Sequence, residues 1–400
     1  MRILILAPQV FYSTRGTPLS VYHRAKILTG LGHDVEILTY PAGNQPPDLD
    51  VKIHRARGLY FIRNIEAGPS CRKIWFDCWF FMNFFFRLLR GRYDIVFGHE
   101  EGGFMASLAS HLFRVPVVYE MHSSLPLQIN EWNFSKNRLV IGFFRWVERV
   151  AIRNCMATVA ISPGVAQAAR AAVPEANVVM VPNLFPVSAD RHTDSHTDVH
   201  TRDSRQLRQE LGLSHQHKVV LYTGSFVPLQ ALDLLITSIP GVVRRLPMAR
   251  FVLVGGRRHE IESLQNLAAT LEIASHVQLL PARPLSDMPI FEAASDVLVS
   301  PRITGINPPG KLYSYLQSRR PVVATNCLVH TQFLDDSVAI LTPPDPEGLA
   351  NGIIAALEEK ERTRRLTAAA LELVRVRFCP EQARRIYKEL LDSAPQRRAR

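Results

Sequence analysis

The run VVLYTG at residues 219–224 decides the fold, because it restarts a pattern with which the chain opens at residues 2–7, RILILA. Each run is short and apolar, ends at a turn residue and is followed by residues with helix-like apolar spacing. Short apolar runs that alternate with helical segments are typical of a parallel sheet with helices on both faces. The second start in mid-chain therefore predicts two α/β units.

The remaining apolar runs set the expected domain boundaries. They lie at 35–40, 94–98, 115–120, 156–161, 250–254, 277–280, 296–300, 321–325 and 338–341. We expect an N-terminal unit at 1–186, a polar linker at 187–216, a second unit at 217–378, and a C-terminal helix with a basic tail at 379–400 that packs back toward the first unit. The linker contains a near-repeat of His-Thr-Asp from His192, which fits either a solvated insertion or a metal-binding loop. We favour the insertion, because there is no second cluster of ligands.

Composition narrows the function classes. A hydrophobic fraction of 47% with 21% charged residues excludes a disordered chain. The net charge of +11 and the isoelectric point near 9.7 favour anionic partners such as phosphates or an anionic membrane surface. Dispersed Arg and Lys without a recognition module argue against nucleic acid. Five scattered cysteines and an N-terminal apolar run too short for a signal peptide indicate the cytoplasm.

The loop from Ser300 to Lys311 carries the densest chemical signal. It contains Gly305 and Asn307, its only charges are Arg302 and Lys311, and no carboxylate occurs between residues 297 and 334. Two cations and free backbone amides without an acid suit a diphosphate. The alternative is a surface loop with solvated cations.

Glycines also follow three of the apolar runs, at Gly16-Thr17, at Gly224-Ser225 and at Gly255-Gly256. Ligands bind beyond the carboxyl ends of parallel strands, and glycine lets the backbone approach them. The spacing is not GxGxxG, so no dinucleotide site is predicted.

In order and spacing, these segments resemble the GT-B glycosyltransferases, and most of all those of family 4. The similar segments are RILILA with Gly16-Thr17-Pro18, Leu31–Val35, Val118–Ser123, Ala160–Ser162, Val181–Asn183, Tyr222–Ser225, Leu232–Leu235, Leu253–Gly256 and Pro321–Thr325. The resemblance implies an α/β fold of two Rossmann-like, doubly wound domains that face each other across a cleft. It also implies transfer from a nucleotide-diphosphate sugar with retention of anomeric configuration and without a metal or other cofactor.

The chain departs from the family pattern at the expected donor site. Ser314 stands where the family usually has a ribose-binding glutamate, and Ser225 and Gln230 stand where it has an Arg and a Lys for the diphosphate. The resemblance therefore assigns the diphosphate to Arg302 and Lys311 instead. The donor-binding residues that we expect are Gly16, Thr17, Gly224, Ser225, Gly255, Gly256, Gly305, Asn307 and Ser314.

In the first unit, the resemblance places His122 toward the donor sugar, where it would donate a hydrogen bond or stabilise developing charge. Glu100 and Glu101 follow another apolar run and are candidates for orienting an acceptor. Asp48-Leu49-Asp50 fits a metal motif only formally, because it lies in a Pro-rich loop before a strand, far from the donor half of the chain.

The segment 71–92, CRKIWFDCWFFMNFFFRLLRGR, is aromatic with basic flanks. Asp77 and Asn83 make its apolar part too short for a transmembrane span. It fits either a helix in a membrane interface or a helix that covers the sheet. A peripheral contact with the anionic inner face of the membrane would suit a lipid-linked acceptor.

The sequence thus predicts a glycosyltransferase that acts on a lipid-linked or saccharide acceptor in cell-envelope polysaccharide or glycolipid synthesis. Two alternatives remain. A catalytically degenerate relative would bind a nucleotide sugar or serve as a scaffold. This alternative is suggested because the family usually has two glutamates here, and the chain has Ser314 at the second and no acid at the first. A sugar-nucleotide 2-epimerase would need carboxylates in the cleft, which the stretch 297–334 does not supply.

Overall fold

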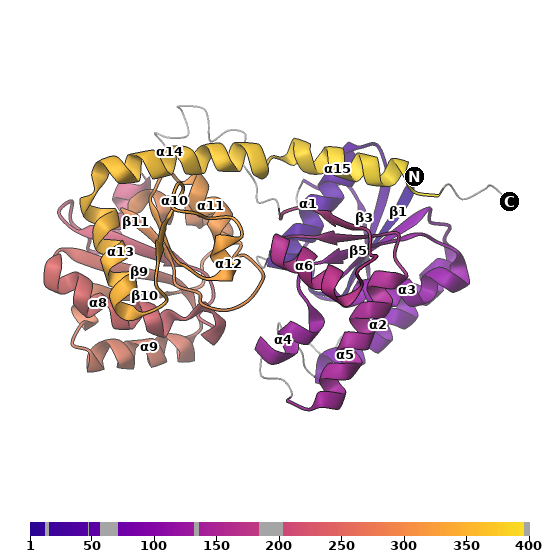
Figure 1. Cartoon of the computed structure of the whole chain (residues 1–400), viewed down its shortest axis with the longest axis horizontal. Coiled ribbons are helices and arrows are strands. Elements are labelled where there is room, and N and C mark those ends of the chain that lie inside the picture. Colours follow the sequence, from indigo (N-terminus) through magenta and orange to yellow (C-terminus); the bar gives the residue numbers. More distant parts are fainter. Residues whose placement is uncertain (13–15, 47, 57–70, 132–135, 184–202, 396–400) are drawn as a thin grey trace. The chain divides into compact units, whose positions relative to one another are not determined.

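The computed structural model describes residues 1–12, 16–46, 48–56, 71–131, 136–183 and 203–395. The chain divides into two compact units (Figure 1). Unit 1 comprises Met1–Leu184 and Pro380–Arg400, and unit 2 comprises Phe185–Cys379. The predicted His/Asp repeat and the basic tail at 396–400 lie outside the described residues.

Unit 1 is built on a parallel sheet of seven strands in the order β3-β2-β1-β4-β5-β6-β7. The strands are β1 (Arg2–Ala7), β2 (Asp34–Thr39), β3 (Lys52–Arg55), β4 (Ile95–His99), β5 (Val117–Met121), β6 (Ala157–Ala160) and β7 (Val178–Met180). Ile3 to Ala7 are completely buried, as expected for a strand covered on both faces. The sequence did not predict β7, a short edge strand, whereas β3 is the strand expected after the Pro-rich loop at Asp48–Asp50.

Alternate residues of β1 face two different helical layers. Ile3 and Ile5 lie in one core with residues of α1 (Gly16–Gly30) and α15 (Pro380–Asp392). Leu4 and Leu6 lie in another with α2 (Cys71–Arg90) and α3 (Glu101–Phe113). The other helices of unit 1 are α4 (Leu125–Glu131), α5 (Arg138–Arg153) and α6 (Pro163–Ala172). Helix α15, which follows unit 2 in the chain, is therefore part of the core of unit 1.

Unit 2 contains a parallel sheet of six strands in the order β10-β9-β8-β11-β12-β13. The strands are β8 (Lys218–Thr223), β9 (Ala249–Gly256), β10 (Val277–Pro281), β11 (Val297–Ser300), β12 (Val322–Thr325) and β13 (Ile340–Thr342). The helices are α8 (Leu232–Arg245), α9 (Arg258–Thr270), α10 (Met288–Ala294), α11 (Lys311–Gln317), α12 (Leu328–Thr331), α13 (Pro346–Glu358) and α14 (Lys360–Arg377), with short 3₁₀ turns at Pro228–Gln230, Ala274–His276 and Leu285–Asp287. Two parallel, helix-covered sheets confirm the predicted α/β class.

Part of the predicted linker belongs to the body of unit 2. Residues 203–210 are helical, and Leu207, Leu211 and Leu213 pack against the core around Val219. The apolar spacing of these three leucines explains the attachment, because it gives the segment a buried side.

Helix α2 covers the sheet with one side and presents the other to solvent. Phe76, Phe80, Phe84 and Leu88 recur every four residues and are buried against the core with Leu4. Asp77, which interrupts the apolar run, accepts a hydrogen bond from the Tyr40 hydroxyl. Within the described residues, none of the helices combines the length and the apolar character needed to cross a bilayer.

Candidate functional site

In unit 2, the carboxyl ends of β8 and β9 touch through their glycines. The Gly224 N–H donates to the Val254 carbonyl at 2.9 Å. A Cβ on Gly255 would lie 2.2 Å from the carbonyl oxygen of Gly224, so no side chain fits there. Gly224 and Gly255 also have φ values of +132° and +128°, which L side chains rarely adopt. The predicted strand-end glycines are thus required by the backbone itself.

The Lys311 ammonium lies beside Gly224. Its Nζ is 3.5 Å from the centroid of the Tyr222 ring and donates to Gln230 Oε1 at 3.1 Å. A Cβ on Gly224 would come within 3.1 Å of the same Nζ. Removal from water, together with the nearby Arg302 charge, holds the pKa of Lys311 well below its usual range. A bound anion would oppose this shift and favour the charged form of Lys311.

Arg302 holds the loop that carries Lys311. Its Nε donates to the Thr304 carbonyl at 2.8 Å and its Nη1 to the Asn307 carbonyl at 3.1 Å, and only 6% of the residue is exposed. Gly305 has a φ of +101°, and a Cβ there would lie 2.2 Å from Arg302 Nη2. The guanidinium is therefore directed at loop carbonyls, and its positive charge acts on the site from within the loop.

A buried histidine ties the same loop to β12. His330 bonds Ser300 Oγ through Nε2 at 2.9 Å and Thr325 Oγ1 through Nδ1 at 3.0 Å. Thr325 Oγ1 also donates to the Arg302 carbonyl. Burial lowers the pKa of His330 to about 4, so the ring stays neutral at physiological pH. These bonds fix the path of the backbone into Arg302.

The remaining predicted donor residues lie around this cluster with different surroundings. Ser225 accepts from the Tyr222 hydroxyl through its carbonyl at 2.9 Å, and Ser314 Oγ donates to the Lys311 carbonyl at 3.0 Å. A Cβ on Gly256 would meet the Phe226 ring at 2.5 Å, so packing demands this glycine. In unit 1, Gly16 begins α1 and has open space around it, and Thr17 is half-buried.

At the carboxyl ends of β4 and β5 in unit 1, two buried histidines form a pair. His99 Nδ1 and His122 Nε2 are 3.1 Å apart. Burial and the charge of Arg24 lower the pKa of His122 to about 3. Burial, His122 and Arg24 hold the pKa of His99 well below its usual range. Both rings are therefore neutral, and one donates its proton to the other in the hydrogen bond.

Behind this pair lies an ion pair that the sequence did not reveal. Arg24 Nε is 3.5 Å from Glu120 Oε2, and both side chains are fully buried. The Tyr387 hydroxyl of α15 donates to Glu120 Oε1. In the sequence, Arg24 stands between Tyr22 and Ala25 in a stretch with helix-like apolar spacing. A cation at such a position is the one local signal that a buried partner exists.

Three of these groups have the composition of a metal site. His99, Glu120 and His122 place ligand atoms within 4.8 Å of one another. However, the two imidazoles bond each other and the Arg24 guanidinium neutralises Glu120. A cation would have to displace both interactions, so we interpret the cluster as a hydrogen-bonded network.

Glu100 and Glu101 have different environments. Glu100 precedes α3 with a φ of +49°, and Ser123 Oγ lies 3.4 Å from its carboxyl oxygens. Burial, followed by the charge of Glu101, raises the pKa of Glu100 to about 8, so it carries a proton at neutral pH. Glu101 accepts a hydrogen bond from Lys73. Glu100 is thus the candidate that can donate to an acceptor, whereas Glu101 is paired within the protein.

Comparison with known proteins covers both units. Residues 14–188 match the model of Glycosyltransferase Family 4, and residues 217–359 match that of Glycosyl transferases group 1. The chain is 32% identical over 125 residues to the GDP-mannose-dependent alpha-(1-6)-phosphatidylinositol monomannoside mannosyltransferase of Mycolicibacterium smegmatis, covering 30% of this chain and 32% of the relative. It is 34% identical over 103 residues to the D-inositol 3-phosphate glycosyltransferase of Mycobacteroides abscessus, covering 25% of this chain and 22% of the relative. These alignments span a third or less of the relatives' length.

Solved structures share the whole fold at low sequence identity. The crystal structure of Anabaena Alr3699/HepE in complex with UDP superposes with a TM-score of 0.75 at 19% identity, over 98% of this chain and 100% of that one. WaaG, a glycosyltransferase involved in lipopolysaccharide biosynthesis, gives a TM-score of 0.72 at 14% identity, over 96% and 99%. At this identity the likeness concerns the fold.

Proposed function

On the premise that this chain belongs to the family 4 glycosyltransferases with a GT-B fold, we propose that it transfers a sugar from a nucleotide-diphosphate sugar to an acceptor hydroxyl with retention. The observation that carries the proposal is the Lys311 ammonium, which lies over the Tyr222 ring and beside Gly224, the glycine that touches Gly255. It supplies a cation beside Gln230, the position where the family pattern has lysine, from a different segment of the chain.

The leaving diphosphate is the ligand that this cation fits. The partners of Lys311, the Gln230 amide and the Tyr222 ring, are neutral, and no carboxylate forms an ion pair with it in the part of the chain that the structure describes. Its positive charge therefore remains available to a bound anion. Arg302 contributes through the loop, whose conformation it fixes. Fixed cations of this kind stabilise the charge that develops as the sugar leaves.

Unit 1 supplies uncharged polar groups suited to sugars. A neutral His122 accepts or donates a hydrogen bond, and protonated Glu100 donates one to an acceptor oxygen. We propose that the acceptor attacks on the face from which the diphosphate departs. The new bond joins the acceptor oxygen to the anomeric carbon, the bond to the phosphate oxygen breaks, and the hydroxyl proton passes to that oxygen.

The acceptor that we propose is a lipid-linked or saccharide component of the cell envelope, met at the cytoplasmic face of the membrane. The relatives support this class, because one name specifies a phosphatidylinositol mannoside and another structure concerns lipopolysaccharide biosynthesis. The relatives differ in the nucleotide of the donor: the name of one specifies GDP-mannose, whereas the structure of another contains UDP. The donor screen therefore includes both nucleotides.

The test is a donor screen with the purified full chain. UDP- and GDP-hexoses are supplied with membrane lipid extract as acceptor, and products are identified by mass spectrometry. We expect Lys311→Ala to lower kcat/KM for the active donor about 10²- to 10³-fold, the loss typical of one charge-stabilising group. Arg258→Ala is the control, because its side chain is 94% exposed in the same unit. Equal turnover of both variants and the unaltered protein would refute the assigned role of Lys311.

A second candidate is a relative that binds the nucleotide sugar without transferring it. Ser314 and Gln230, which replace the family's glutamate and lysine, favour it. A thermal-shift screen distinguishes the two: stabilisation by a nucleotide sugar without hydrolysis or transfer, across all donors, would support the binding protein.

A further inference from the structure

Five large apolar side chains form a stripe on the solvent side of α2. They are Trp75, Trp79, Met82, Phe86 and Leu89, and Trp75 is 77% exposed. Their spacing of three or four residues places them along one side of the helix. Burial of α2 against the sheet involves other residues, so this stripe is not required by the core of unit 1.

Helices α3 and α5 extend the stripe into a broader face. Leu108 and Leu112 are exposed on α3, and Leu139, Phe143 and Trp146 on α5. These helices adjoin: the rings of Phe85 (α2) and Phe113 (α3) are 5.2 Å apart, and those of Phe104 (α3) and Trp146 (α5) 5.9 Å. Ten of the eighteen exposed large apolar side chains among the described residues thus lie on three helices. We call α2, α3 and α5 with these side chains the apolar face.

Charge on the apolar face has one sign. Arg90, Arg138, Arg145 and Arg149 are exposed there. The acids of the same helices are engaged within the protein: Asp77 by Tyr40, Glu101 by Lys73, and Glu148, which is buried, by the Leu125 N–H. Exposed aromatic residues beside arginines match the interface of an anionic bilayer. A dimer formed through this face would place the arginines of one copy against those of the other, and like charges repel.

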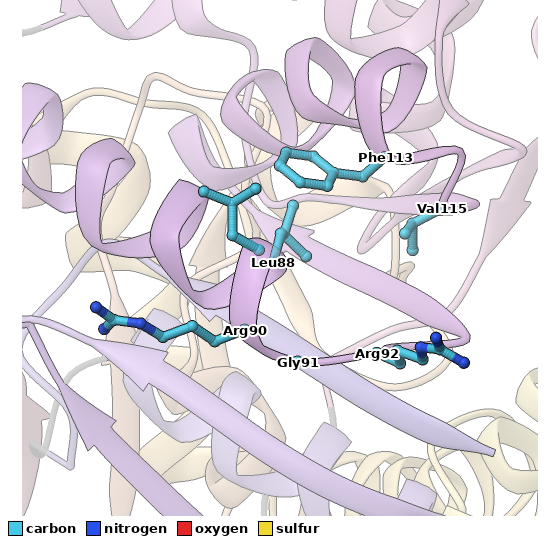
Figure 2. Close-up of a pocket in the computed structure, with 7 residues that line it drawn as sticks. Leu88, Arg90, Gly91, Arg92, Phe113 and Val115 are labelled. Carbon is cyan, nitrogen blue, oxygen red and sulfur yellow. The ribbon is translucent and has the colours of Figure 1, made fainter.

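A cavity of about 370 Å³ opens beside this face, where α2 and α3 end (Figure 2). Leu88, Phe113 and Val115 provide its apolar lining, and Arg90 and Arg92 extend on either side of the chain turn at Gly91. The loops after α2 and α3 lead into the amino ends of β4 and β5. The cavity therefore lies at the amino ends of the strands, whereas Glu100 and His122 lie at their carboxyl ends. Guanidinium groups beside an apolar hollow suit a phosphate attached to an aliphatic chain.

We propose that unit 1 docks on bilayers of anionic phospholipid through the apolar face, and that the cavity between the ends of α2 and α3 receives the phosphate and first chain segment of one such lipid. The inference deepens the proposed function, because docking would bring unit 1 to the membrane that holds a lipid-linked acceptor; the cavity itself is separate from the acceptor groups Glu100 and His122. The docking itself does not depend on the transfer reaction.

The experiment measures binding of the full chain to sedimenting vesicles of phosphatidylcholine with and without phosphatidylglycerol. We expect binding only with the anionic lipid, reduced by high salt. Trp79→Ser with Phe86→Ser should weaken it more than tenfold, because two large side chains no longer insert. Arg90→Gln with Arg92→Gln should weaken it about fivefold per arginine. Met248→Ser with Leu285→Ser, exposed residues of unit 2, should bind unchanged.

Three outcomes would overturn the proposal. The first is equal binding by the Trp79/Phe86 variant and the unaltered chain, or no binding to the anionic vesicles. The second is a dimer in light scattering that the same variant abolishes, which would assign the face to a second copy. The third is inorganic phosphate competing at the arginines without vesicle binding, which would make the cavity a site for free anions. Transfer to a soluble saccharide acceptor, measured in parallel, shows separately whether the proposed reaction stands.

Discussion

The ends of the two sheets have the same topology and opposite chemistry. In unit 2, Lys311 lies beside Gly224, which touches Gly255, and the charge of Arg302 acts on Lys311. In unit 1, the corresponding strand ends carry neutral histidines and the protonated Glu100. A parallel sheet directs its ligands to this edge in either case, and the side chains decide which ligand is favoured. One end therefore suits a diphosphate and the other a polyhydroxylated, uncharged molecule.

The two ends also differ in how buried charge is compensated. Glu120 forms an ion pair with Arg24 and accepts a hydrogen bond from the Tyr387 hydroxyl, so its charge is compensated within unit 1. Lys311 has neutral partners, so its charge is left for a ligand. A buried ion pair completed by the protein points to structure, whereas a buried cation among dipoles points to binding.

Gly255→Ala tests the glycine contact at the unit 2 end and should have the largest effect on stability. The added Cβ would meet the Gly224 carbonyl oxygen at 2.2 Å, at a φ of +128°. We expect a loss of about 3 to 5 kcal/mol in the free energy of unfolding, together with loss of donor binding. Denaturant titration and calorimetry with the donor measure the two effects.

Gly212→Ala is the matched control for this substitution. Gly212 also lies in unit 2 with a positive φ of +65°, but nothing lies within 4 Å of an added Cβ. It should cost only about 1 kcal/mol. Equal losses for Gly212→Ala and Gly255→Ala would show that the close approach of the two strand ends contributes nothing.

Glu100→Gln tests the protonated carboxyl at the unit 1 end. The pKa of Glu100 is raised to about 8 in the folded chain, whereas an unfolded glutamate titrates near 4.3. The stability that the bound proton provides is thus complete below the unfolded pKa and is lost as the pH rises to about 8. Relative to the unaltered protein, the variant should gain about 2 to 4 kcal/mol between pH 5 and pH 8. Unfolding at a series of pH values measures this gain.

Glu36→Gln provides the opposite case for the same measurement. Although burial opposes ionisation, hydrogen bonds from Arg2, Tyr93 and His54 hold the pKa of Glu36 at about 2. This carboxyl is ionised in both states above pH 5, so its own titration adds nothing to the stability difference between pH 5 and pH 8. The difference should change only through His54, whose pKa is lowered by burial and raised by the Glu36 carboxylate, and by less than that of Glu100→Gln. A pH dependence of Glu100→Gln no larger than that of Glu36→Gln would contradict the assigned protonation of Glu100.

Tyr387→Phe tests the buried compensation of Glu120 and should have the smallest effect. The ring contacts with Arg24 and Phe97 remain, and only the hydroxyl that donates to Glu120 is lost. We expect a loss of about 1 to 3 kcal/mol in the free energy of unfolding. Glu120→Gln, which also removes the charge that faces Arg24, should cost more. If Tyr387→Phe unfolds like the unaltered protein, the hydroxyl does not stabilise Glu120.

The sequence predicted the sheets well, because buried parallel strands are continuous apolar runs. Eleven strands match the predicted runs within two residues at most boundaries. The edge strand β7 was not predicted, since Val178–Met180 has only three residues. The strand expected after Asp50 had no predicted bounds, since Lys52–Arg55 is largely polar. The interpretation of segment 71–92 as a sheet-covering helix is confirmed for its buried side, whereas membrane contact stays a prediction.

The sites were predictable in composition and not in geometry. Local spacing placed Gly224 and Gly255 at strand ends and Lys311 at the end of a loop that follows another strand, and the resemblance added His122. Nothing local shows that Lys311 bonds Gln230, which is 81 positions away, or that Tyr387 reaches Glu120 from 267 positions away. Such contacts depend on packing between distant segments, and the one local hint, Arg24 on an apolar face, does not identify its partner.

The place of α15 has a consequence for biosynthesis. Tyr387, Leu390 and Leu391 share a core with Val21 and Leu28, so the first unit contains residues made after the second. A nascent chain that has emerged only to residue 379 would hold Arg24 and Glu120 without the Tyr387 hydroxyl and with part of their apolar cover missing. The N-terminal half therefore stays incompletely folded on the ribosome until the second half has been translated.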